Sequence, residues 1–333
     1  MTCCLPLPST RSGQMAIGCL QAVDSAGASA SCRPMERKPN IDTFGALALT
    51  AFAFLLAFNQ VVIKVTNGGI QPIFFAGLRS AGAVLCVYAY MRWRGINLQW
   101  TKGTKRWGAI TGTVFAFEFM FLFLALDLTT VGRSGVIFYS MPLWLALLAH
   151  FFVAGDRMTL QKAVGLGFAF SGVAWAILAR DDGTANIWGD LAALGAAIGW
   201  AATALLAKVS PLNRVRPEMQ LFWQVLISAP ILLFAAMFAG ELIRDLQPIH
   251  LWGLAFQIVI VVSAGFIFWL WLLSIYPASG VASFSFLSPV LSVGLGWLLL
   301  GEEVGPNLLG ALVLVAIGIL LINRPPRSRK TSL

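Results

Sequence analysis

The sequence predicts an all-α membrane protein with ten transmembrane helices arranged as two inverted five-helix repeats. Three observations support this prediction: a composition poor in charge, ten apolar segments long enough to span a bilayer, and an internal repeat. Of the 333 residues, 58% are hydrophobic and 11% are charged, whereas soluble domains carry about 25% charged residues. The mean hydropathy of +0.81 also indicates a polytopic membrane protein.

The net charge of +9 does not indicate a nucleic-acid partner. The basic residues lie between hydrophobic runs and form no patch with interleaved aromatic residues. The expected surroundings are therefore a lipid bilayer and its headgroups. The five cysteines show neither metal-ligand spacing nor the pattern of a disulfide framework.

Ten segments meet the length that a bilayer requires, because a hydrocarbon core of about 30 Å needs about 20 apolar residues of helix. They cover residues 42–64, 72–91, 107–126, 133–153, 162–179, 189–207, 218–239, 251–274, 279–300 and 305–322. The connections are short, which predicts one helical bundle without a large soluble domain. Residues 1–38 are rich in Ser, Ala, Gly and Cys, so we expect a disordered tail or a start assigned too early, and residues 324–333 form a basic tail.

Lys and Arg are distributed unevenly between the two sides of the predicted bundle. With a cytoplasmic N-terminus, eighteen lie on the cytoplasmic side and four, namely Lys64, Arg133, Arg180 and Arg244, lie on the opposite side. Positive residues concentrate in cytoplasmic loops. An even number of spans then places both termini in the cytoplasm.

The two halves of the chain match each other at a nearly constant offset. "FGALALTAFAFLLAFNQVVIK" (44–64) aligns with "WGDLAALGAAIGWAATALLAK" (188–208), and further on Pro142 falls on Pro289. The matches include Gly, Pro and charged positions, so they are not explained by apolar composition alone. Five spans per half is an odd number, and the second half must therefore be inverted. Inverted repeats that meet near the membrane midplane are typical of secondary transporters.

These segments resemble the EamA family of the drug/metabolite transporter superfamily. The resemblance is carried by "AFNQVVIK" in the first span, "AGLRSAGAVL" in the second, the Pro-containing fourth and ninth spans, and the turns "GDRMTLQKAVGLGFAFSG" and "GEEVGPNLLGALVLVAIG". It covers residues 42–180 and 188–323 as two EamA-like repeats. It implies an inner-membrane carrier, most relatives being exporters of amino acids, related metabolites or drugs.

The expected function is therefore a secondary transporter that exports small metabolites, such as amino acids, by alternating access. The alternative is a non-transporting scaffold or a lipid scramblase of the same fold. We find no H-E-x-x-H, G-x-S-x-G or P-loop motif, so we expect no enzyme and no cofactor, and two histidines make a metal site improbable. A homodimer is left open.

One carboxylate lies inside the run "FAFEFMFLFLALD" (115–127), and it raises the question of a site within the membrane. A charge at the centre of a membrane helix costs about 2.5–3.5 kcal/mol, so Glu118 and Arg79 are expected to be paired or to face a watery cavity. The helical rise brings the polar groups of the first four spans together in the outer half of the first repeat. The predicted substrate-binding residues are Asn59, Gln60, Arg79, Glu118, Tyr139, Trp144, Trp200 and Gln224.

Two interpretations of Arg79 and Glu118 are open. They form a buried ion pair that fixes helix register, or they line the cavity for a charged or zwitterionic metabolite. In the second case Glu118 is also the candidate for proton coupling, because removal from water favours the protonated carboxyl group. The second half carries Gln224 at the position that matches Arg79, so any role of that charge is confined to one half.

Other marked residues are expected to have structural roles. Lys64 and Lys208 lie at span ends and are expected to extend to the interface, while Asp127 and Arg133 flank a short loop and are expected to be solvated. Glu302 and Glu303, with Asp156 and Arg157, lie in tight turns. Pro142 and Pro289 fall inside spans at matched positions, where kinks would suit moving gates.

Overall fold

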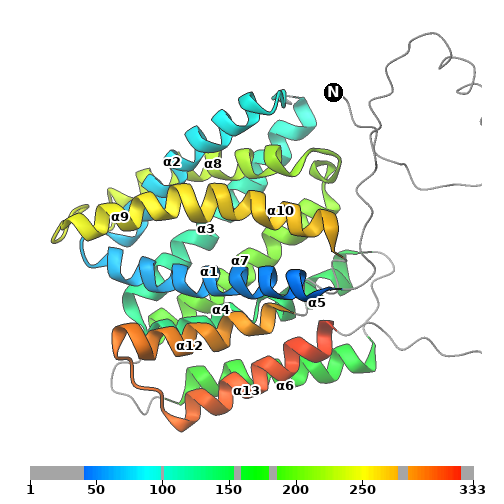
Figure 1. Cartoon of the computed structure of the whole chain (residues 1–333), viewed down its shortest axis with the longest axis vertical. Coiled ribbons are helices and arrows are strands. Elements are labelled where there is room, and N and C mark those ends of the chain that lie inside the picture. The colour runs from blue at the N-terminus through cyan, green and yellow to red at the C-terminus, as the bar shows by residue number, and fades with distance from the viewer. Residues whose placement is uncertain (1–40, 99–100, 154–158, 180–185, 277–283, 324–333) are drawn as a thin grey trace, which may run out of the picture.

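The computed structural model describes residues 41–98, 101–153, 159–179, 186–276 and 284–323. Most of these residues are helical, and the helices lie side by side in a bundle (Figure 1). The first half contains α1 (Thr43–Asn67), α2 (Pro72–Trp93), α3 (Lys102–Leu128), α4 (Val131–Phe138), α5 (Met141–Phe152) and α6 (Leu160–Leu178). The second half contains α7 (Ile187–Val209), η1 (Pro211–Arg214), α8 (Pro217–Ala236), α9 (Pro248–Phe256), η2 (Gln257–Gly265), α10 (Phe266–Ile275), η3 (Phe284–Phe286), α12 (Leu287–Leu300) and α13 (Pro306–Asn323).

Eight helical segments of the described chain are long and apolar enough to cross a membrane, and α12 and α13 are two shorter apolar helices. The all-α membrane class is confirmed. Within the described residues the only β-pairing is a single bridge between Ile70 and Ile243. The two predicted tails, the loop residues 156, 157 and 180, and the start of the ninth predicted span lie outside the described residues.

The contacts between the two halves are reciprocal. The corresponding helices α2 and α8 pack together, as do α6 and α13, and Figure 1 shows both pairs side by side. Helix α3 packs on α7, and its counterpart α9–η2–α10 packs on α1. Likewise α12 packs on α1, while α4 and α5 pack on α7. Each of these contacts reappears when the halves are exchanged, as an approximate two-fold relation between repeats requires.

The fourth predicted span is not one continuous helix. Helix α4 ends at Phe138 and α5 begins at Met141, so that Tyr139 and Ser140 lie between them. Pro142 occupies the second position of α5, where its missing N–H removes no bond from that helix. Pro289 is the third residue of α12 and follows the 3₁₀ turn η3. Both prolines therefore stand in the first turn of a helix rather than in its middle.

The eighth span contains a π-helix, η2, between two α-helical segments. Within it, Ser263 Oγ donates to the carbonyl of Ile258, five residues earlier, at 2.8 Å. Gln257, the first residue of η2, is fully buried. π-Helical turns are rare and are frequent at functional sites, and nothing in the apolar run "QIVIVVSAG" predicted one.

Glycine allows the closest approach in the α6–α13 pair. A Cβ added to Gly318 would lie 2.6 Å from Ala169 Cβ and 2.7 Å from the carbonyl oxygen of Gly165, whereas a Cβ on Gly167 would meet nothing within 4 Å. We expect Gly318→Ala to destabilise the protein by about 1–3 kcal/mol through overpacking. Gly167→Ala is the matched control and should be neutral or slightly stabilising. Thermal unfolding of the purified variants measures both, and equal midpoints would contradict this packing.

Candidate functional site

Glu118 on α3 is buried, at 1% exposure, and its carboxylate is held by the second half of the chain. Oε2 accepts a hydrogen bond from Thr203 Oγ1 on α7 at 2.9 Å. The two helices come close because residue 199 is glycine: a Cβ there would lie 3.0 Å from Glu118 Cβ. Thr203 follows Gly199 by one helical turn and therefore reaches the carboxylate. Thr203 was missed in the sequence because a lone threonine in an apolar helix carries no signal of its partner.

Arg79 on α2 is also buried, but it does not form the predicted alternative, an ion pair with Glu118. Its guanidinium lies over the ring of Phe119, with Cζ 3.9 Å from the ring centroid, and 5.7 Å from that of Phe123. Nε and Nη1 have no hydrogen-bond partner among the described residues. A cation–π contact offsets part of the loss of water, but the donors of the guanidinium are left for another group to use.

The polar side chains of α1 point to different neighbours. Asn59 Oδ1 accepts a hydrogen bond from Gln257 Nε2 on η2. Gln60, at 1% exposure, lies near Gly135 of α4 and Ser292 of α12. Both of these partner segments, η2 and α12, belong to the second half. The polar side chains of α1 therefore lie against residues of both repeats.

The aromatic candidates lie around one apolar cluster. Tyr139 is buried in this cluster, and Trp144 and Trp200 pack against it half-buried. Trp144 Nε1 donates to Ser140 Oγ at 3.2 Å, between α4 and α5. No hydrogen bond joins Trp200 or Gln224 to the other candidates within the part of the chain that the structure describes, so the geometry does not connect these two residues to Glu118 or Arg79.

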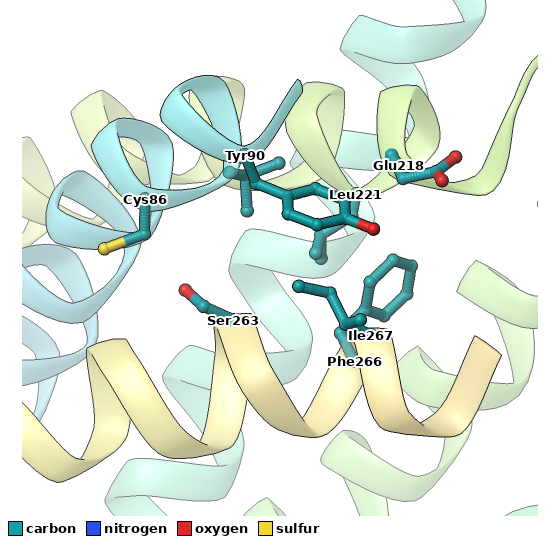
Figure 2. A pocket seen from close by; sticks show the side chains of 8 residues that line it. Cys86, Tyr90, Glu218, Leu221, Ser263, Phe266 and Ile267 are labelled. Atoms are coloured by element: carbon teal, nitrogen blue, oxygen red, sulfur yellow. The ribbon is translucent and has the colours of Figure 1, made fainter. Parts of the chain in front are cut away.

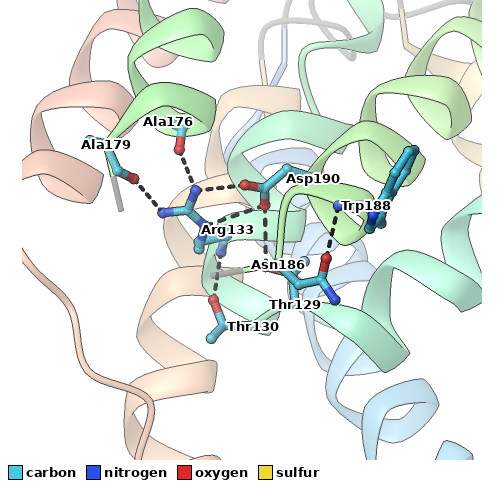
Figure 3. Close-up of polar contacts among 8 residues, drawn as sticks. All are labelled: Thr129, Thr130, Arg133, Ala176, Ala179, Asn186, Trp188 and Asp190. Carbon is cyan, nitrogen blue, oxygen red and sulfur yellow. Dashed lines mark hydrogen bonds and ion pairs between the residues drawn. The ribbon is translucent and has the colours of Figure 1, made fainter. Parts of the chain in front are cut away.

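Arg133 is not solvated, contrary to the expectation from sequence. It is 3% exposed and forms an ion pair with fully buried Asp190, with 2.6 Å between Nη2 and Oδ2. Nη1 and Nη2 also donate to the carbonyls of Ala179 and Ala176, at 2.9 and 2.5 Å. Figure 3 shows the guanidinium between the carboxylate and these two carbonyls. Since the last carbonyls of a helix lack partners, Arg133 satisfies the end of α6 while joining it to the start of α7.

The short turn between α3 and α4 receives further contacts. Lys64 Nζ donates to the carbonyl of Thr129 at 2.7 Å, so this lysine bonds to the turn at the end of the neighbouring span. Glu302 accepts hydrogen bonds from the backbone N–H groups of Val131 and Gly132, at 2.6 and 2.9 Å. It therefore caps the N-terminus of α4, where negative charge is favoured. We call these contacts, with the two ion pairs of Arg133 and Asp127, the α3–α4 turn cluster.

The second ion pair of this cluster is more accessible. Arg244, at 40% exposure, binds Asp127 through both carboxylate oxygens, at 2.7 and 3.0 Å. The hydrogen bond to Asp127 raises the pKa of Arg244 above its ordinary value, against the opposing effect of partial burial. Nη1 also donates to the carbonyl of Asn67 at 3.0 Å. The loop between α8 and α9 is therefore hydrogen-bonded to the C-terminal end of α1.

A pocket lies between α2, α8 and the η2–α10 segment (Figure 2). It is small: its volume open to the centre of a water-sized molecule is about 10 Å³. Tyr90 and Leu221 lie on one side of it, and Ser263, Phe266 and Ile267 on the other. None of the predicted site residues lines it, so the pocket is separate from the buried polar groups.

The EamA-like transporter family model matches residues 43–178 and 187–324. The chain belongs to this family. The two matched segments are the two halves whose contacts are reciprocal, and the family accounts for both the helical architecture and its duplication. For this EamA-family chain, the family indicates a membrane transporter.

Relatives support the same class. The uncharacterized transporter YvbV of Bacillus subtilis is 26% identical over 90% of this chain and 97% of its own length, and YoaV of the same organism is 24% identical over 83% and 95%. A probable amino-acid metabolite efflux pump of Salmonella typhimurium is 26% identical over 78% and 88%. A solved crystal structure, 19% identical, matches 84% of this chain and 96% of its own with a TM-score of 0.59, and it supports the fold.

Proposed function

We propose that this EamA-family protein is a secondary transporter of the bacterial inner membrane that exports small metabolites, such as amino acids, by alternating access. Both termini are cytoplasmic, and Glu118 carries a proton during the cycle. The substrate-binding residues are those predicted above, with Thr203 added through its contact with Glu118. A second copy of the chain is compatible with this proposal but is not required by it.

The observation that carries the proposal is the pair of buried ionisable groups on α2 and α3. Ionisable side chains within membrane spans mark substrate or ion pathways. Arg79 retains unused donors, which suit a carboxylate or another anionic group. Glu118 is bonded across the boundary between the repeats, where alternating access requires relative movement. The efflux pump named among the relatives supports export and amino-acid metabolites.

Resistance to toxic amino-acid analogues tests the transport function directly. Cells that overexpress the protein should survive higher analogue concentrations than cells carrying an empty vector. Inverted vesicles from the same cells should accumulate the radiolabelled amino acid that the screen identifies. If neither resistance nor accumulation appears while labelled phospholipids exchange between leaflets in proteoliposomes, the scramblase alternative is correct.

The inverted orientation of the repeats predicts opposite accessibility at corresponding helix ends. Gly68 follows α1 and Asn213 follows α7, and both are exposed. In a cysteine-free background, Gly68→Cys should react with a membrane-impermeant maleimide in intact spheroplasts. Asn213→Cys should react only after permeabilisation. Labelling of both positions from the same side would contradict the proposed topology.

A further inference from the structure

The helix break between α4 and α5 removes the regular helical donor of one backbone carbonyl, that of Phe138. Tyr139 N donates to Gly135 O, and Ser140 N to Ile137 O. The carbonyl of Phe138 would pair with the N–H of residue 142 in a continuous helix, but that residue is proline and has none. The C-terminal end of a helix also carries partial negative charge. The end of α4 is therefore a source of negative potential inside the fourth span.

Two buried side chains from other helices converge beside this half-helix. An added Cβ on Gly135 would lie 3.1 Å from Ser292 Oγ and 3.4 Å from Gln60 Oε1. Ser292 is fully buried, and its Oγ has no hydrogen-bond partner among the described residues; neither amide atom of Gln60 has one. Tyr139, which directly follows α4, is buried, and its phenol lies beside the Ser292 side chain.

These unpartnered groups are unfavourable unless something binds them. A buried hydroxyl or amide without a hydrogen bond costs about 1–3 kcal/mol in proteins, and here such groups lie within one junction of α1, α4 and α12. Such groups in folded proteins are normally paired with water, an ion or a ligand. The unpartnered oxygens of this cluster suit an occupant that accepts their lone pairs.

We propose that Gln60 Oε1, Ser292 Oγ and Tyr139 Oη, at the C-terminal end of α4, form a binding site for a small monovalent cation. The oxygens are neutral, and no charged side chain hydrogen-bonds to Gln60 or Ser292 within the described chain. A divalent ion would be expected to bring carboxylate ligands. The two sources of such a cation are Na⁺ and the ammonium group of a transported amine, and the second rests on the proposed function.

The location gives the site a role in the transport cycle. Gln60 and Tyr139 belong to the first repeat and Ser292 belongs to the second. A cation that binds all three stabilises one relative arrangement of α1, α4 and α12. Broken helices whose C-terminal ends face a cation are a recurring arrangement in secondary transporters, and here the unpartnered oxygens lie against Gly135, about one helical turn before the break. This site is distinct from Glu118, whose carboxylate is held by Thr203.

Thermal unfolding of the purified full-length protein, followed by tryptophan fluorescence, tests the site without requiring transport. Equal concentrations of sodium, methylammonium and choline chloride are compared. We expect sodium or methylammonium to raise the midpoint by about 3 °C relative to choline, and Ser292→Ala to abolish this shift. Ser228→Ala, an equally buried serine between α2 and α8, should retain it. Gln60→Met is the second test variant if Ser292→Ala does not fold.

Each outcome decides the proposal. A shift with sodium that Ser292→Ala or Gln60→Met removes supports an inorganic cation site, and a shift with methylammonium alone supports recognition of an amine. The proposal is overturned if neither salt shifts the midpoint, or if the shift survives in both variants. If no cation shifts the unfolding midpoint, the proposed transport function still stands on the resistance assay. If the resistance assay fails, the sodium measurement still tests the cation site.

Discussion

Arg133→Leu is expected to lower the free energy of unfolding by about 3–5 kcal/mol, the magnitude seen when one member of a buried ion pair is removed. Asp190, which is fully buried, would be left with Thr129 as its one side-chain hydrogen-bond donor among the described residues. The carbonyls of Ala176 and Ala179 would lose their donors. Thermal unfolding and the yield of monodisperse protein in detergent measure the effect.

Two control variants separate this effect from a general sensitivity to lost charge. Arg133→Leu combined with Asp190→Leu should recover much of the stability, because no unpaired charge is left in the bundle. Arg244→Leu breaks the accessible ion pair with Asp127, which is worth about 1 kcal/mol or less. If Arg133→Leu and Arg244→Leu lower stability equally, burial does not determine the contribution of these pairs.

The lengths of the apolar segments and the match between the two halves of the sequence were sufficient to predict the fold class and its duplication. Within the described residues, the predicted apolar segments overlap helices of the structure, because membrane helices must satisfy their own backbone hydrogen bonds and expose apolar side chains. The breaks inside these segments, between α4 and α5 and at the π-helix η2, are not determined by hydrophobicity. Pro142 indicated a local disturbance, but whether it bends a helix or begins one depends on Tyr139 and Ser140. The π-helix η2 has no local signal at all, since its residues are ordinary membrane residues.

For the candidate site, the sequence predicted individual buried polar residues but not the residues that contact them. Polar residues in apolar spans identified Gln60, Arg79 and Glu118, and all three are buried. Their partners were not predictable, because the partners lie in other helices and sequence spacing carries no information on which helices meet. Arg133 shows the limit most clearly: beside a short loop it was expected to be solvated, and only the packing of α6 and α7 encloses it.

Arg79→Met and Glu118→Gln are expected to abolish or strongly reduce transport while the protein remains folded. Arg79 has donors without partners, so methionine of similar length removes a buried charge and should leave stability unchanged or raise it by about 1–4 kcal/mol. Glu118→Gln keeps the side-chain shape and an acceptor for Thr203. Transport of the amino acid found in the resistance screen, measured in vesicles at several pH values, should fall at least ~10-fold for Glu118→Gln and lose its pH dependence.

Measuring both stability and transport distinguishes residues that bind the substrate from residues that only stabilise the fold. A residue kept for stability lowers both stability and transport when it is replaced, whereas a binding residue lowers transport alone. Glu241→Gln, an exposed carboxylate in the loop before α9, is the matched control and should change neither. Unchanged transport and pH dependence in Glu118→Gln would remove the proton from the proposed mechanism. A loss of stability in Arg79→Met would show that the contact with Phe119 is structural, and the unused donors would then need an occupant other than the substrate.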